Sequence, residues 1–323
     1  MAAVLNILLV TLPFFALVLA GFVAARWRLL PLEAIPGLNS FVLFFALPAM
    51  LYRFGSTTPI AQLLDAWVGG IYLACALVMV AVTIALTRNE RIRWNDASFG
   101  ALVAAFPNSG FMGVPLLVAL LGPSAAGPVI LLMLVDMVVT SSLCVALSRL
   151  DEGEGHGGRA MAVAARKALR GVVTNPMPWA IGLGALASAA HFGLPAPVEK
   201  TVWLLADAAS PVALFTIGAV LARSQIQANY PMPVSDYLPV ALLKLLLHPL
   251  LVFGAGSLAI ALGAPLSRFA LVVMTLTAAL PSASNVSLLA ERMGADNGRI
   301  ARIILVTTTA AFLTFSAAVA WLA

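Results

Sequence analysis

The feature that most constrains this chain is a series of long apolar runs separated by short polar linkers. A helix needs about 20 apolar residues to cross the hydrocarbon core of a bilayer. Only 10% of the 323 residues are charged, against about 25% in soluble globular proteins, so a soluble fold could not cover its surface. The composition predicts an integral membrane protein and excludes a cytosolic enzyme, a disordered chain, a nucleic-acid binder and a disulfide scaffold.

Ten runs are long enough to be read as membrane-spanning helices, so the fold class predicted is an all-α membrane protein with ten transmembrane helices. No linker between them has the size of a soluble domain. The predicted spans are Ala3–Ala24, Pro36–Tyr52, Trp67–Thr87, Ser98–Leu121, Ala125–Ser148, Pro178–Leu194, Val198–Ala222, Tyr237–Gly263, Leu266–Leu289 and Ile303–Leu322.

The basic residues predict the orientation. Met1–Asn6 carries no Lys or Arg, so the first run is expected to be a retained helix and not a signal peptide. With both termini outside, the cytoplasmic loops hold 14 of the 18 Lys and Arg residues and the outside loops hold three, while Lys244 lies within a span. This asymmetry fits the positive-inside rule. The chain is therefore expected to be a multi-pass protein of the cytoplasmic (inner) membrane, with N- and C-termini outside.

Prolines interrupt four spans in a repeating way. Pro48 in the second span has a counterpart in Pro211 of the seventh, and Pro107 in the fourth has one in Pro281 of the ninth. The offset is five spans each time. A proline removes one helix hydrogen bond and bends the chain, so this pattern predicts paired helix breaks in two five-helix repeats.

Because five is odd, the second repeat must enter the membrane upside down, as in the inverted repeats of many transporters. The domains expected are a first repeat over 1–148, a cytoplasmic linker over 149–175 and a second repeat over 176–323. Discontinuous helices of such repeats meet near the bilayer midplane and form substrate sites there. Proline-broken helices 4 and 9 are thus expected to cross.

Segments in both halves carry a family resemblance: Asn39–Phe41 with Leu47–Ala49, Phe106–Leu116, Asn175-Pro176, Ala213–Gly218 and Pro281–Asn285. Together they resemble the auxin efflux carrier family of prokaryotes and plants, over nearly the whole chain. The resemblance implies a 5+5 inverted repeat, similar to the folds of sodium/proton antiporters and of sodium/bile-acid symporters. It also implies a scaffold of helices 1, 2, 6 and 7, a mobile transport domain of helices 3–5 and 8–10, an elevator mechanism and a homodimer through the scaffold. Neither auxin as substrate nor regulation through a long central loop is carried over.

The residues at the two breaks are the expected substrate-binding set. Their amides and hydroxyls can bind a carboxylate without a permanent charge, and a half-helix N-terminus after each break favours an anion. The alternative is that they only cap the broken helices. The set is Pro107, Asn108, Ser109, Pro281, Ser282, Ser284 and Asn285.

Four ionisable residues lie within spans, where charges are costly and mark functional sites by default. Asp136 is a candidate proton or cation carrier, and its alternative is a neutral or bonded structural aspartate. Asp207 could partner it, but the resemblance places Asp207 on the scaffold. Lys244 and His248, four residues apart, share a helix face; snorkelling of the lysine and a satisfied structural histidine are the alternatives. Asn39 is a further site-lining candidate.

These observations predict a secondary active transporter that moves a small organic anion by alternating access, and not an enzyme. The partners expected are a small anionic substrate and membrane lipid, with no nucleic acid, cofactor or metal. Cys75 and Cys144 lie in apolar runs and are expected to be packing residues. The alternatives are a sodium-coupled organic-anion symporter of the bile-acid type, an intramembrane enzyme acting on lipid, and a channel.

Overall fold

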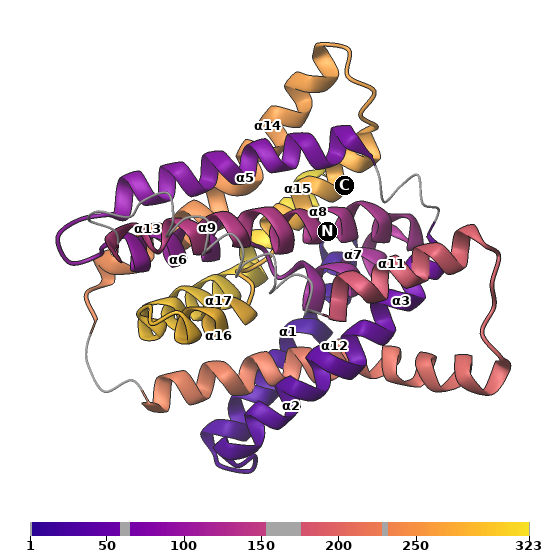
Figure 1. The fold of residues 1–323 in the computed structure, drawn as a ribbon, viewed down its shortest axis with the longest axis horizontal. Helices are drawn as coiled ribbons and strands as arrows, with labels where there is room; N and C mark the ends of the chain where they lie inside the picture. The colour runs from indigo at the N-terminus through magenta and orange to yellow at the C-terminus, as the bar shows by residue number, and fades with distance from the viewer. Residues whose placement is uncertain (1, 59–64, 153–175, 228–231, 323) are drawn as a thin grey trace. The chain divides into compact units, whose positions relative to one another are not determined.

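The computed structural model describes residues 2–58, 65–152, 176–227 and 232–322, and every regular element in these ranges is a helix (Figure 1). A helix satisfies its backbone hydrogen bonds within one segment, which apolar chains need inside a bilayer. The all-helical class predicted from the sequence is confirmed. Most of the expected linker, 153–175, lies outside the described residues.

Seven helical stretches of the described chain are long and apolar enough to cross a membrane. The protein is therefore a multi-pass membrane protein. Of the other three predicted spans, two consist of shorter halves around a break and the third is a helix of 14 residues. The count of ten stays a prediction. The seven are Leu9–Arg26, Leu32–Thr57, Ala66–Thr87, Pro123–Leu147, Ala196–Ile226, Leu238–Ala261 and Asn297–Leu322.

The chain divides into two compact units, and each draws on both halves of the sequence. Unit 1 is formed by Met1–Asp65, Gly110–Leu131 and Asn175–Ala228. Its elements are α1 (Ala2–Arg26), η1 (Leu32–Ala34), α2 (Ile35–Phe41), η2 (Val42–Ala46), α3 (Leu47–Thr57), α7 (Val114–Leu121), η4 (Pro123–Ala125), the first part of α8 (Ala126–Val135), α11 (Pro176–Ala189) and α12 (Ala196–Gln227).

Glycines let the long helices of unit 1 approach closely. In the α1–α12 contact, a Cβ on Gly21 or on Gly218 would lie 1.8 Å from a carbonyl oxygen of the opposite helix. In the α3–α11 contact, a Cβ on Gly184 would lie 2.5 Å from the carbonyl oxygen of Tyr52. Small residues at such contacts are how membrane helices gain packing energy. Unit 1 is thus held by two backbone-to-backbone contacts.

Unit 2 is formed by Ala66–Ser109, Leu132–Thr174 and Asn229–Ala323. η3 (Ser109–Gly113) begins at its edge. The core of unit 2 is made of two half-helices. The residues of α6 from Ala97 to Ala105, and most of those of α15 from Ala270 onward, are buried on all sides. Its elements are the end of α8, α5 (Ala66–Thr87), α6 (Trp94–Ala105), η5 (Asp136–Thr140), α9 (Ser141–Leu147), η6 (Leu150–Glu152), η7 (Val234–Asp236), α13 (Leu238–Leu242), η8 (Leu243–Leu247), α14 (His248–Ala261), α15 (Arg268–Ala279), α16 (Asn285–Arg292) and α17 (Asn297–Leu322).

The four span prolines have three different outcomes. Pro107 and Pro281 interrupt the helix, as predicted. Pro48 follows the π-helix η2, where the Leu47 N–H donates to the carbonyl of Val42, five residues back, and the helix continues as α3. The predicted interruption at Pro211 is wrong, because α12 runs through it from Ala196 to Gln227. A membrane helix can lose one hydrogen bond and bend without breaking.

Candidate functional site

The two broken segments of unit 2 lie side by side as a short antiparallel pair. Pro107 and Ser282 form an isolated β-bridge. The Asn108 N–H donates to the Pro281 carbonyl at 2.8 Å, and the Ala283 N–H donates to the Phe106 carbonyl at 3.0 Å. Backbone groups that leave a helix at membrane depth must find partners in the protein or in water. Here the two breaks satisfy each other at the prolines where they were predicted. We call the paired segments, Phe106–Ser109 and Pro281–Asn285, the crossover.

The polar side chains at this crossover are largely buried. Asn108, Ser109, Ser282 and Ser284 are at most 9% exposed, and Asn285 is half-buried. The Ser109 hydroxyl is directed to the carbonyl of Pro107. A buried hydroxyl normally has a partner, but the Ser282 hydroxyl has none among the described residues.

Two half-helices begin at the crossover. After the second break, α16 starts at Asn285, and its cap residue Ser284 makes no side-chain cap bond. After the first break, the helical run Ser109–Leu121 starts with the π-helix η3. The helix dipole favours negative charge at such ends. The seven predicted substrate-binding residues therefore lie together at one crossover, with donors suited to an anion.

Asp136 is fully buried in unit 2, and its carboxylate has two partners. The Tyr72 hydroxyl on α5 donates to Oδ2 at 2.7 Å, and the Thr140 hydroxyl donates to Oδ1 at 3.0 Å. The π-helix η5 begins at Asp136, and its i→i+5 pattern is often found at functional sites. Sequence reasoning missed Tyr72, although a phenol within an apolar span needs a hydrogen-bond partner.

Lys244 is also fully buried, so the snorkelling interpretation is wrong. Its Nζ donates to the Ala278 carbonyl at 2.7 Å and lies 3.0 Å from Nδ1 of His248. It also interacts electrostatically with Asp136. His248 is fully buried, and its Nε2 has no partner among the described residues. Of the two ring nitrogens of His248, only Nδ1 therefore has a partner among the described residues, so the interpretation as a fully hydrogen-bonded structural histidine holds for that nitrogen alone.

One hydrogen bond links the lysine to the crossover. In an unbroken helix, the Ala278 carbonyl would accept from the N–H of Ser282, four residues on. That N–H instead donates to the Thr307 hydroxyl at 3.3 Å. Lys244 replaces the lost donor at Ala278. A charged side chain thus caps the last turn before the break at Pro281, and Thr307 is a second residue that sequence reasoning missed.

The two remaining candidates, Asp207 and Asn39, belong to unit 1. Arg53 of α3 donates to the Asp207 carboxylate at 2.6 Å, and this ion pair explains an acidic residue in α12. Asn39 is half-buried in α2. Both therefore lie outside the unit that holds the crossover.

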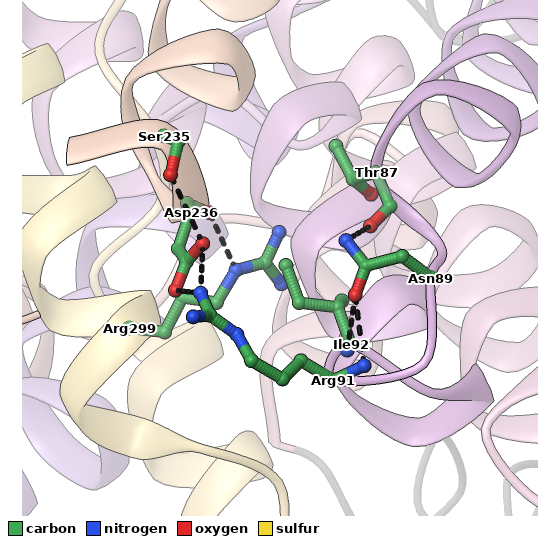
Figure 2. Close-up of polar contacts among 7 residues, drawn as sticks. All are labelled: Thr87, Asn89, Arg91, Ile92, Ser235, Asp236 and Arg299. Atoms are coloured by element: carbon green, nitrogen blue, oxygen red, sulfur yellow. Dashed lines mark hydrogen bonds and ion pairs between the residues drawn. The ribbon is translucent and has the colours of Figure 1, made fainter. Parts of the chain in front are cut away.

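A second polar cluster, also missed from the sequence, ties together one end of unit 2 (Figure 2). Arg299 in the first turn of α17 is 2% exposed. Its Nε donates to the Asp236 carbonyl and its Nη1 to the Asp96 carbonyl, each at 2.7 Å. Arg91 forms an ion pair with the Asp236 carboxylate. Gly100 leaves room for Arg299, since a Cβ there would lie 2.7 Å from Nη1. The cluster joins α6, η7 and α17.

No group of three metal-ligating side chains occurs within the described part of the chain. The polar side chains at the crossover are amides and hydroxyls, whose N–H and O–H groups can donate to an oxyanion.

Comparison with known proteins supports a transport role. The family model described as "Membrane transport protein" matches residues 7–319. The chain is 31% identical to the "Putative malonate transporter" of Rhizobium meliloti (strain 1021), over 92% of this chain and 90% of that protein. It is 24% identical to "Auxin efflux carrier component 8" of Arabidopsis thaliana, over 84% and 85% of the two chains. It is also 24% identical to the "Uncharacterized transporter YfdV" of Escherichia coli (strain K12), over 87% and 86%.

The family model covers almost the whole chain, and the named relatives are transporters, not enzymes. These matches agree with a multi-pass helical fold and with the resemblance found in the sequence motifs. The chain therefore belongs to the membrane transport protein family that includes the auxin efflux carriers.

Proposed function

We propose that the protein is a secondary active transporter of a small organic anion and that the anion binds at the crossover. The observation that carries the proposal is the pairing of Phe106–Asn108 with Pro281–Ala283 in the core of unit 2. This pairing places the Asn108 amide and the unpartnered Ser282 hydroxyl in one buried region. A carboxylate there gains donors without a permanent positive charge, so the empty site can cross the membrane at low electrostatic cost.

The proposed topology is ten spans in two inverted repeats of five. Contacts within each unit support it, because they come in pairs related by an offset of five spans. In unit 1, the α1–α12 contact corresponds to the α11–α3 contact. In unit 2, α5–α6 corresponds to α14–α15, and α6–α9 corresponds to α15–α17. The proposed orientation in the inner membrane, with both termini outside, rests on the distribution of basic residues.

The proposed mechanism is of the elevator type. Unit 2 contains the crossover and would carry the substrate, while unit 1, packed through glycine contacts, would be the scaffold and the homodimer interface. One feature differs from the division implied by the family, because Gly110–Leu131 groups with unit 1. α7 in this segment packs on α1, so the moving part is proposed to end directly after the crossover.

The proposed coupling group is the buried set of Tyr72, Asp136, Lys244 and His248. A proton on Asp136 would remove a buried negative charge that interacts with Lys244, and Lys244 caps Ala278 next to the crossover. Asp136→Asn should therefore flatten the pH dependence of transport more than it changes the apparent affinity. A pH profile equal to wild type would remove Asp136 from coupling, and a requirement for sodium would favour the sodium-coupled symporter.

Small dicarboxylates are the first substrates to test, because one relative bears the name of a malonate transporter. Uptake of labelled malonate would be measured in proteoliposomes for wild type and Asn108→Ala. We expect the variant to lose most transport while its thermal unfolding stays close to wild type. Ser40→Ala is a matched control, since that hydroxyl donates to the Pro36 carbonyl of its own helix and lies in unit 1. Wild-type transport by Asn108→Ala would rule out the crossover as the site.

A further inference from the structure

Unit 2 carries an apolar groove that the transport proposal does not use. It has a volume of about 620 Å³ and is formed by α5, α9 and the start of α6, within the range of about 300–1,000 Å³ for small-molecule sites. Seven of its nine lining residues are aliphatic, among them Leu77, Ile84 and Leu147. The other two, Arg88 and Trp94, are close neighbours, because the guanidinium lies 4.5 Å from the centre of the indole ring.

The length of the groove matches one leaflet of a bilayer. Leu77 and Arg88 are eleven residues apart along the chain, which corresponds to about 16 Å of helix. Half of the hydrocarbon core measures about 15 Å. Leu77 is 42% exposed and Ala81 is exposed, so the groove is open along this length. Its shape and lining fit a hydrocarbon chain lying parallel to α5.

The positive charge at one end of the groove indicates which kind of molecule binds there. Arg88 follows the last residue of α5 and is exposed. The neighbouring Arg91 and Arg93 form ion pairs with Asp236 and Asp151, whereas no ion pair of Arg88 occurs among the described residues. In the proposed orientation this loop lies on the cytoplasmic side, where anionic lipids are concentrated. Tryptophan is typical of the headgroup level.

We propose that this groove binds an anionic phospholipid of the cytoplasmic leaflet. One acyl chain lies between α5 and α9, and the headgroup phosphate pairs with the guanidinium of Arg88 beside Trp94. A phosphate accepts charge-assisted hydrogen bonds from a guanidinium, and the lipid covers the aliphatic side chains that the groove exposes. The inference is independent of the substrate site, since none of the crossover residues lines the groove.

The test is native mass spectrometry of the full-length protein with phosphatidylglycerol and phosphatidylcholine of identical acyl chains. Wild type should retain phosphatidylglycerol in preference. Arg88→Gln should reduce that retention about fivefold. Ala81→Trp, which fills the groove and keeps the arginine, should reduce retention as well. Arg91→Gln is the matched control: it removes the same charge from the same loop and should retain lipid as wild type does.

Several results would overturn the proposal. Equal retention of the two lipids would exclude headgroup recognition, and undiminished binding to Ala81→Trp would exclude the acyl chain from the groove. An equal loss in Arg91→Gln would reduce the effect to general surface charge. Displacement by millimolar inorganic phosphate would make Arg88 a site for free phosphate and not for lipid.

Discussion

Pro211 in unit 1 and Pro281 in unit 2 have opposite effects on their helices. α12 continues through Pro211, whereas α15 ends two residues before Pro281. Each proline removes one backbone N–H, so the loss of a donor does not explain the difference. Around Pro281, the partner segment Phe106–Asn108 and the hydroxyl of Thr307 accept or supply the hydrogen bonds that the helix gives up. At Pro281 the helix ends beside these partners, whereas at Pro211 it continues.

The two units are also stabilised differently. Unit 1 uses close backbone contact at glycines such as Gly184, and its ion pair Arg53–Asp207 is partly exposed. Unit 2 buries Asp136 and Lys244 completely and depends on hydrogen bonds to hold them. Variants should therefore act through packing in unit 1 and through unpaired polar groups in unit 2.

The largest effect on stability is expected for Lys244→Met. It leaves the Ala278 carbonyl without the lysine donor and His248 Nδ1 without its partner, and each buried polar group left unpaired costs about 1–3 kcal/mol. Thermal unfolding in detergent would measure the loss. Adding Asp136→Asn should recover part of it, because the amide removes the buried negative charge that Lys244→Met leaves without a nearby cation. Lys200→Met, at an exposed site on α12, is the control. Equal stability of Lys244→Met and this control would show that the lysine has no structural role.

A smaller loss is expected for Gly184→Ala in unit 1. The new Cβ would lie 2.5 Å from the Tyr52 carbonyl oxygen, and overpacking costs about 1–3 kcal/mol. Gly182→Ala is matched to it, since it lies on the same helix with nothing within 4 Å of the new Cβ. Thermal unfolding should separate the two variants. If both behave alike, the α3–α11 contact does not depend on close approach.

Replacing Pro211 and Pro281 tests directly the contrast between a helix that continues through its proline and one that ends before it. Pro211→Ala restores one donor within a continuous helix and should change stability by at most about 1 kcal/mol, with transport retained. Pro281→Ala allows α15 to continue and removes the geometry that pairs it with Asn108, so transport should fall strongly. Unfolding and proteoliposome uptake would be measured for both. Transport by Pro281→Ala at the level of Pro211→Ala would contradict the contrast.

The smallest effect on stability is expected for Ser282→Ala. Its buried hydroxyl has no partner in the described structure, so its removal leaves no group unpaired and should be neutral within about 0.5 kcal/mol. Uptake should nevertheless fall, because the hydroxyl is proposed to bind substrate. Loss of stability without loss of uptake would assign Ser282 a packing role.

The crossover could be predicted from the sequence, because Pro107 and Pro281 are both followed by Asn or Ser residues and lie in spans that are five apart. The interruption predicted at Pro211 is wrong because the sequence of one span does not show whether a second segment lies beside its proline. Burial of Lys244 could not be predicted. The lysine bonds the Ala278 carbonyl, 34 residues away, and that carbonyl is free to accept only because the helix break removes its usual N–H donor. Arg299 lies outside the predicted span Ile303–Leu322, because α17 begins six residues before that span.

The central claim, that the crossover binds the anion, is tested most directly by isothermal titration calorimetry of the purified protein with a panel of mono- and dicarboxylates. We predict saturable binding of at least one dicarboxylate to wild type and to Ser40→Ala. Binding should be lost in Asn108→Ala and weakened in Ser282→Ala, with all four proteins equally folded. Unchanged affinity in Asn108→Ala would contradict the account.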